Sequence, residues 1–148
     1  MLKDRVKVEA SKWSFSKKRL LNLAIGLTAL LLTELARTFY RPFIYENGIN
    51  DFHIADTLGN SLGTVATVFV FVGLLGRDRL EDLFLIRTVT ISVFVYELAH
   101  PLLGKPIDPF DMVATVLAGF FCEGLYRLLY KSEQPVRKQS GDNAQSAE

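Results

Sequence analysis

The chain contains very little cysteine and histidine, and this scarcity argues against several classes of function. Cys122 is the single cysteine among 148 residues, so an intramolecular disulfide is excluded. It lies in an apolar run and is expected to be a small packing residue. The two histidines, His53 and His100, are of a residue type that ligates metals, but neither belongs to the closely spaced histidine or cysteine pairs typical of such sites. We therefore predict no metal site and no cofactor.

A strong net charge and nucleotide-binding motifs are also missing. The formal net charge is +1, so no global field favours a nucleic acid as partner. The sequence has neither a P-loop nor a dinucleotide fingerprint. Ser61 and Ser92 lie in apolar stretches without an indicated base, which argues against a nucleophilic triad. We predict no nucleic-acid partner and find no motif for a known reaction.

A cleavable signal peptide is not indicated at the N-terminus. The first 19 residues are charged, and the apolar stretch that follows is too long for a signal sequence and lacks a small-residue cleavage site. That stretch is therefore expected to remain in a membrane.

What the chain has instead is four long apolar segments, at residues 20–39, 54–76, 83–103 and 109–130. A transmembrane helix needs about 20 predominantly apolar residues. The segments are apolar all round rather than striped, and a soluble domain of this length could not bury four such helices. The predicted fold class is an all-α membrane protein with four transmembrane helices in one domain, residues 20–131.

The two ends of the chain differ from this domain. Residues 1–19 form either a basic segment that lies on the cytoplasmic membrane surface, with Trp13 at the head groups, or a disordered basic leader. Residues 132–148 are polar and rich in turn residues, and we predict a disordered cytoplasmic tail.

The positive charges predict the orientation in the membrane. Seven of the 17 Lys and Arg residues lie in residues 1–19. Because cytoplasmic segments carry an excess of these residues, both termini are predicted to be cytoplasmic, with residues 40–53 and 104–108 facing outward. The other flanking Lys and Arg residues agree: Arg77, Arg79, Arg127, Lys131, Arg137 and Lys138 lie on the inner side, and the outer segments contain only Arg41 and Lys105, with Arg37 close by.

The two halves of the chain resemble each other. The first segment ends in TELARTFYRP and the third in YELAHPLLGKP, while the second opens with IADTLGNSLG and the fourth with PFDMVATVLAG. Each half is a helix hairpin that begins on the same side, so the repeat is predicted to be parallel. The aligned pairs are Glu34 with Glu97, Arg37 with His100, and Asp56 with Asp111.

The spacing of the polar residues predicts a shared site. Glu34 and Arg37 are three residues apart, as are Glu97 and His100, so each pair shares one helix face. All of the aligned polar residues fall near the outer ends of their helices, which predicts one outward-facing cluster. Small residues allow membrane helices to approach closely, and we expect this role for Gly59, Gly63 and Gly119.

These motifs resemble the VanZ-like family of small bacterial membrane proteins. The shared pattern is an acidic residue that ends one helix, a basic or polar turn, and D-x-x-x-N-x-x-G at the start of the next. It covers about residues 30–125 and departs at Thr115, where Asn is expected, and at His100, where Gln is usual. The resemblance implies this fold in a bacterial plasma membrane. The family's namesake is linked to glycopeptide (teicoplanin) resistance, but the resemblance implies no defined reaction for this chain. The matching residues are Glu34, Arg41, Asp56, Asn60 and Gly63 in the first half, and Glu97, Lys105, Asp108 and Asp111 in the second.

The predicted site is a polar pocket with a basic mouth, which suits an anionic head group of a membrane lipid or of a cell-envelope precursor. Desolvated carboxylates beneath that mouth could act as acid or base. The candidate catalytic residues are Asp56, Glu97 and Asp111, and the candidate binding residues are Glu34, Arg37, Arg41, Asn60, His100 and Lys105.

Purely structural roles compete with this hypothesis. Asp108 is expected to cap the fourth helix, followed by Pro109 and by Asp111 at a capping-box position. Asp56 is expected to lie one to two turns inside its helix, too deep to cap. The pairs of Glu34 and Glu97 with their neighbours could serve only to neutralise charge, Glu123 with Arg127 is expected to be a structural ion pair, and Arg87 a snorkelling anchor.

Two other functions therefore remain open alongside the lipid-binding hypothesis: a small proton or ion transporter, and a non-catalytic membrane scaffold. The sequence leaves open whether the protein is an enzyme and whether it forms a homo-oligomer.

Overall fold

The computed structural model describes residues 2–104 and 106–131, with side chains from residue 17 onward, and every regular element in that part is helical. This confirms the all-α prediction for the part described. The elements are α1 (Leu2–Leu35), the π-helix η1 (Ala36–Tyr40), α2 (Arg41–Glu46), α3 (Ile54–Leu75), α4 (Arg79–Leu98), the 3₁₀-helix η2 (His100–Leu103) and α5 (Pro109–Leu129). The predicted tail, residues 132–148, and Lys105 lie outside the described residues.

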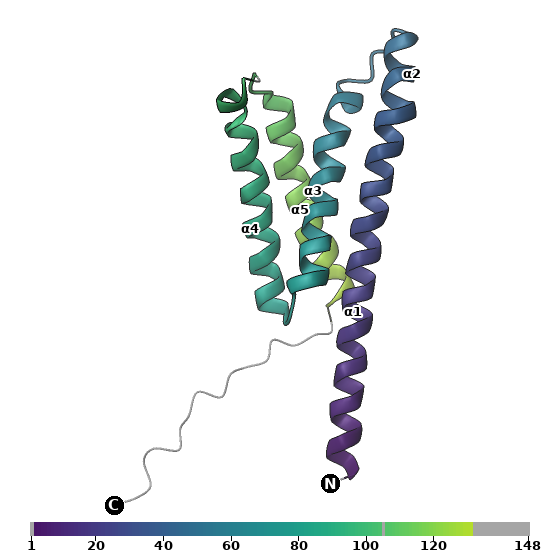
Figure 1. The fold of residues 1–148 in the computed structure, drawn as a ribbon, viewed down its shortest axis with the longest axis vertical. Coiled ribbons are helices and arrows are strands. Elements are labelled where there is room, and N and C mark those ends of the chain that lie inside the picture. The colour runs from purple at the N-terminus through teal and green to yellow at the C-terminus, as the bar shows by residue number, and fades with distance from the viewer. Residues whose placement is uncertain (1, 105, 132–148) are drawn as a thin grey trace, which may run out of the picture.

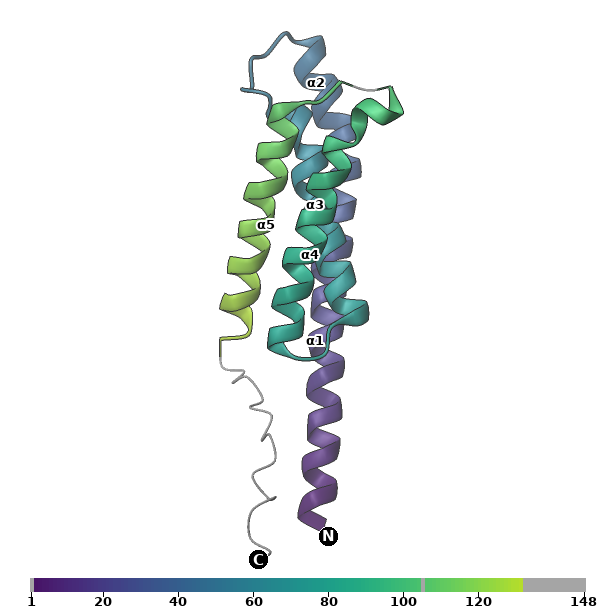
Figure 2. The same ribbon diagram turned by 90° about the vertical axis from the view of Figure 1, so that its left-hand side faces the viewer.

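Four long helices lie side by side and alternate in direction (Figures 1 and 2). Helix α3 packs along α1, and α3, α4 and α5 contact one another. Helices α3 and α5 begin at the same end of this bundle, which we call the upper end as in Figure 1, and α4 ends there. The α3–α4 turn marks the lower end, beyond which α1 projects toward the N-terminus (Figure 1).

Three helical stretches have the length and composition of membrane spans: Lys17–Glu46, Ile54–Leu75 and Pro109–Leu129. Large apolar side chains such as Leu31, Phe84 and Phe120 point away from the bundle. Helices that pack inside a bilayer place small residues between them and large apolar residues toward lipid. The three apolar helices thus indicate a membrane protein. The inward stripe of α1 fits the same pattern, with Asn22, Gly26, Ala29 and Thr33 buried.

The third predicted segment differs from the helix found there. Helix α4 begins four residues earlier than predicted and ends at Leu98 rather than 103. Proline has no N–H and cannot continue a helix, so the chain leaves the α-helix before Pro101 and turns through η2 to Gly104, whose φ is +72°. Helix α4 is not among the three candidate spans because its 20 residues include Arg79, Glu81, Asp82, Arg87 and Glu97.

Two aspartates cap helices as local chemistry requires. Asp108 precedes α5 and accepts a hydrogen bond of 2.9 Å from the backbone N–H of Phe110, with Pro109 as the first helical residue. This confirms the predicted start of the last helix. Asp78 caps α4 in the same way, accepting from Leu80 and Glu81 at 2.9 Å.

The apolar core lies between α3, α4 and α5 and includes Val68, Phe69 and Val72 of α3 together with Ile86 of α4 and Cys122 of α5. Burial of Cys122 confirms its packing role.

The three glycines predicted to allow close approach behave differently. A Cβ on Gly119 would lie 2.2 Å from Thr90 Cγ2, so α4 and α5 do approach closely there. For Gly59 and Gly63 the prediction is wrong, because a Cβ would meet nothing within 4 Å. Gly26 and Gly73 bring α1 and α3 together instead, with Cβ distances of 2.8 Å to Val70 Cγ2 and 2.7 Å to Leu23 Cγ.

Candidate functional site

A polar cavity of about 410 Å³ lies at the upper end, between α1, η1, α3 and the start of α5. We call it the upper cavity. Five of the residues predicted as a site line it, although they come from three separate parts of the sequence. Its lining is Thr33, Ala36, Arg37, Arg41, Ala55, Asp56, Leu58, Gly59, Asn60, Asp108 and Asp111.

A π-helix positions the basic side of the upper cavity. Element η1 places Ala36 and Arg37 in a widened turn between α1 and α2, directly before Arg41. Single π turns inside α-helices change the direction of the side chains that follow and occur frequently at functional sites. Arg37 and Arg41, four residues apart, both face the cavity.

Asp56 is the best-connected acidic residue of the upper cavity. Arg41 Nη2 lies 3.2 Å from its Oδ1, the Tyr45 hydroxyl donates to the same oxygen, and His53 Nδ1 lies 3.5 Å from Oδ2. Asp56 is the third residue of α3 and lies in its first turn, so the predicted depth of one to two turns inside the helix is wrong. The carboxylate of Asp51, rather than Asp56, accepts from the backbone N–H of Ala55 at 2.7 Å.

The loop before α3 is held in a left-handed backbone conformation. Phe52 and His53 have φ values of +57° and +65°, a region that bulky residues seldom adopt. The His53 ring stacks on Phe110 of α5 with 4.7 Å between centroids. This contact ties the loop to α5, beside the side chain of Asp56.

Asp111 forms the opposite acidic wall. It is the third residue of α5, as Asp56 is of α3, and it lies close enough to Asn60 and His100 to interact with both. Its Oδ1 atom is buried and has no hydrogen-bond partner. An acceptor of this kind is available to a ligand that donates a proton or to a water molecule.

Of the other predicted site residues, Lys105 lies outside the described part of the chain, and Glu34, Glu97 and His100 are not among those that line the upper cavity. Glu97 and His100 form a pair of 3.2 Å between Oε2 and Nδ1, with side chains only 4% and 14% exposed. Glu34 pairs with Arg37 at 3.5 Å, but the Glu34 side chain is 54% exposed. The predicted single cluster is thus divided, because the end of α4 lies on the other side of α3 from α1.

Glu97 lines a second cavity, which we call the α3–α4 groove, of about 530 Å³. The groove and the upper cavity share Gly59 and Asn60. The groove is lined by Gly59, Asn60, Gly63, Thr64, Thr67, Phe71 and Leu75 of α3, and by Leu85, Thr88, Val89, Ser92, Val93, Tyr96 and Glu97 of α4.

A buried polar cluster at the lower end was not predicted. Asp82 is fully buried, and its Oδ2 lies 3.0 Å from Lys18 Nζ and accepts a 2.6 Å hydrogen bond from the Tyr126 hydroxyl. The backbone N–H of Arg77 donates to Oδ1 at 2.9 Å. Lys18 also lies over the rings of Tyr126 and Tyr130, at 5.4 and 4.8 Å from their centroids. We call these residues the lower cluster.

The contact between Lys18 and Asp82 was not predicted, because the sequence placed Lys18 in the N-terminal leader and Asp82 in a loop between two helices. The one local signal is that Tyr126 and Tyr130 are four residues apart and therefore share a helix face. Tyr130 also donates to Asn22 Oδ1 at 3.1 Å, which joins the end of α5 to α1.

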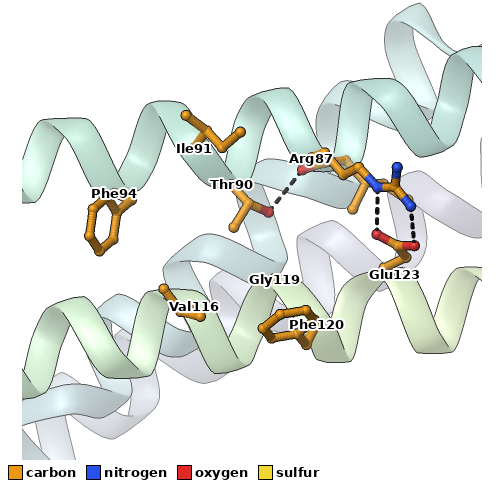
Figure 3. Close-up of a pocket in the computed structure, with 9 residues that line it drawn as sticks. Arg87, Thr90, Ile91, Phe94, Val116, Gly119, Phe120 and Glu123 are labelled. Atoms are coloured by element: carbon orange, nitrogen blue, oxygen red, sulfur yellow. Dashed lines mark hydrogen bonds and ion pairs between the residues drawn. The ribbon is translucent and has the colours of Figure 1, made fainter.

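Arg87 and Glu123 connect α4 with α5 (Figure 3). Arg87 was predicted to be a snorkelling anchor, but it instead makes two hydrogen bonds to Glu123, of 2.7 and 2.8 Å. The predicted pair of Glu123 with Arg127 is confirmed at 2.6 Å. The ion pair closes one end of an apolar groove of about 520 Å³ between the two helices, which also contains Ile91, Phe94 and Phe120.

Within residues 17–104 and 106–131, whose side chains are described, no group of three or more His, Cys, Asp or Glu residues is arranged to hold a metal ion. The chain has no match among protein-family models, curated proteins or solved structures.

Proposed function

We propose that this chain is a VanZ-like protein of a bacterial plasma membrane whose upper cavity faces outward and binds the anionic head group of a lipid or cell-envelope precursor. One observation carries the proposal. Arg37, Arg41, Asp56, Asn60 and Asp111 are spread over 75 positions of the sequence and line a single cavity.

Four membrane spans form the framework of the proposal, with α4 as the fourth beside the three apolar helices. At 1.5 Å per residue, 20 residues extend about 30 Å, the thickness of the hydrocarbon core. Three of the charged residues of α4 have partners that lower the cost of insertion: Lys18 for Asp82, Glu123 for Arg87 and His100 for Glu97. With the Lys and Arg bias, both termini are cytoplasmic and the upper end faces outward.

Two features support the proposed parallel repeat of helix hairpins. Asp56 and Asp111 are each the third residue of their helix. Glu34 with Arg37 and Glu97 with His100 are each pairs of an acidic and a basic side chain three residues apart. A duplicated hairpin places such groups at matching depths, and packing then decides which of them share a cavity.

The two arginines have different roles in binding an anion. Arg41 is held by Asp56, whereas the partner of Arg37 is the exposed Glu34, and exposed pairs are worth little. A phosphate or carboxylate head group can therefore displace Glu34 and bind Arg37, with Arg41 completing a charge-assisted pair. Asp56, Asp111 and, from the adjoining groove, Glu97 are the groups that could donate or accept a proton there.

The test is native mass spectrometry of the protein purified in a gentle detergent. We expect a co-purified anionic lipid that is lost in Asp56→Asn, because Arg41 then loses the carboxylate that positions it. Glu34→Gln is the matched control, since Glu34 does not line the cavity, and it should retain the lipid. Lipid retention in Asp56→Asn, with only a lower thermal stability in detergent, would instead support a membrane scaffold.

A proton or ion transporter is the competing function. The apolar side chains of Val68, Phe69 and Ile86 are at most 1% exposed and lie between the upper cavity and the lower cluster. A continuous polar path is therefore disfavoured through the described bundle. Proton or ion flux into proteoliposomes above the protein-free background would overturn this assignment.

A further inference from the structure

The upper cavity and the α3–α4 groove adjoin each other at α3. Gly59 and Asn60 line both, so a ligand with its head group in the upper cavity has the mouth of the groove beside it. A Cβ placed on Gly59 or Gly63 would meet no atom of another element within 4 Å, so there is free space beside these two glycines.

The groove offers an apolar surface in spite of its hydroxyl-bearing residues. Thr64, Thr67 and Ser92 donate their hydroxyl protons to backbone carbonyls of their own helices, at 2.7, 2.8 and 2.9 Å. Satisfied hydroxyls of this kind need no further partner, so a hydrocarbon chain can lie against their methyl and methylene groups. Most of the other lining side chains are apolar, including Phe71, Leu75 and Leu85, and the exceptions are Asn60, Thr88, Tyr96 and Glu97.

The length of the groove indicates how long a bound hydrocarbon chain can be. Its α3 wall runs from Gly59 to Leu75, about 24 Å at 1.5 Å per residue. One leaflet is half of the hydrocarbon core, or about 15 Å. The groove therefore extends past the midplane, which suits a chain longer than the tail of an ordinary phospholipid.

The apolar groove between α4 and α5 in Figure 3 is a poorer candidate for binding the ligand's hydrocarbon chain. None of its lining residues belongs to the upper cavity, and its polar end is the Arg87–Glu123 pair, in which both charges are already neutralised. Of the two grooves, it is the α3–α4 groove that adjoins a cavity with basic side chains, where Arg37 and Arg41 lie beside the carboxylates of Asp56, Asp108 and Asp111.

We infer that the ligand is a monophosphate carried on one long hydrocarbon chain, the chemistry of a polyprenyl phosphate, with phosphate between Arg37 and Arg41 and the chain between α3 and α4. This inference rests on the proposed function and adds the class of ligand. Surrounding lipid tails are as apolar as the groove, so the chain contributes through its fit and length rather than through the hydrophobic effect.

The experiment measures ligand binding by native mass spectrometry with four probes: a long polyprenyl phosphate, phosphatidylglycerol, inorganic phosphate and a neutral polyprenol. The wild-type protein should prefer the polyprenyl phosphate. Arg41→Gln should weaken its binding about tenfold or more, as expected for the loss of a hydrogen-bonded ion pair. Inorganic phosphate should compete only weakly, because it lacks the chain.

Gly63→Leu tests the groove, and Gly124→Leu is its matched control. Both glycines lie in helices with nothing within 4 Å of a Cβ, but only Gly63 lines the groove. Gly63→Leu should weaken polyprenyl phosphate binding about tenfold, by steric exclusion, and leave inorganic phosphate unchanged, while Gly124→Leu should match the wild type. Ser92→Leu on the opposite wall gives the same readout if Gly63→Leu does not fold.

The outcomes separate the two proposals. If Arg41→Gln weakens binding while Gly63→Leu and Ser92→Leu do not, the groove assignment is wrong and the head-group site stands. Equal binding of phosphatidylglycerol and polyprenyl phosphate would contradict the inference that the ligand carries one long hydrocarbon chain. If Arg41→Gln changes none of the four probes, the proposed function itself fails.

Discussion

At the scale of single residues, the main constraint is that every buried charge needs a compensating group. Asp82 has Lys18 and Tyr126, and Glu97 has His100. An uncompensated charge is costly in a protein interior and in lipid, which is why these side chains meet across long sequence separations. Asp111 differs, because its buried Oδ1 has no hydrogen-bond partner, and this favours a binding role over a capping role.

The lower cluster gives a prediction on stability. Asp82→Asn should lower the free energy of unfolding by about 3–5 kcal/mol, because removal of one member of a buried ion pair leaves the other uncompensated. Thermal unfolding in detergent measures this. Lys18→Met combined with Asp82→Asn should recover most of the loss, since both charges are then gone. A double variant as unstable as Asp82→Asn would show that the pair itself is not the cause.

The pair formed by Arg87 gives a second prediction. Arg87→Met should lower the free energy of unfolding by about 1–2 kcal/mol, the size of polar contacts between membrane helices. Arg127→Met should lower the free energy of unfolding by less, because Arg127 binds Glu123 within α5 and this contact does not connect two helices. Chemical denaturation of the three proteins in one detergent makes the comparison, and an equal cost for both arginines would contradict it.

At the scale of helices, contact depends on small residues placed where backbones come close. The buried residues along α1, such as Gly26 and Ala29, and Gly119 of α5 allow such close contact. Gly59 and Gly63 instead leave space that forms part of the α3–α4 groove. Glycine in a membrane helix can therefore either bring two helices together or leave room for a ligand.

Substitution of these glycines distinguishes the two uses. Gly119→Ala should lower the free energy of unfolding by about 1–3 kcal/mol, as for overpacked sites. Thr90 cannot move aside easily, because its β-branched side chain is stiff and its hydroxyl donates to Ile86 at 2.8 Å. Gly124→Ala on the same helix should raise stability by roughly 0.5–1 kcal/mol through helix propensity. Thermal unfolding of both variants would reveal any reversal of this order.

At the scale of the whole molecule, an apolar middle separates two polar ends. The upper cavity and the lower cluster lie at opposite ends of the α3–α4–α5 core. The upper end contains a cavity, whereas the polar groups of the lower cluster are buried against one another, so the proposed ligand would enter from the upper side.

The proposed topology predicts which positions a membrane-impermeant thiol reagent can reach. In a Cys122→Ala background, cysteine at Asn50 or Ile107 should react in intact cells, and cysteine at Arg77 should react only after lysis. All three positions are exposed in turns at the ends of the bundle. Labelling of Arg77→Cys from outside would reverse the orientation, and labelling of only one of the two upper positions would exclude α4 as a span.

The sequence by itself determined the all-helical class, the three apolar helices and the start of α5. These follow from local chemistry: a long apolar run has to bury its backbone groups in a helix, and Asp108 with Pro109 begins one whatever surrounds it. The grouping of Arg37, Arg41, Asp56, Asn60 and Asp111 was also foreseen, since helix ends on one side of a bundle lie at one depth.

Only the tertiary structure decided which polar side chains meet. A helix turns about 100° per residue, so a shift of a few residues in a helix boundary redirects its side chains. Helix α4 begins earlier than predicted, which places Asp82 against Lys18, and its end lies apart from α1, which separates Glu97 from Asp56. Depth along a helix can be read from hydropathy, but its rotation is fixed by the packing of its neighbours.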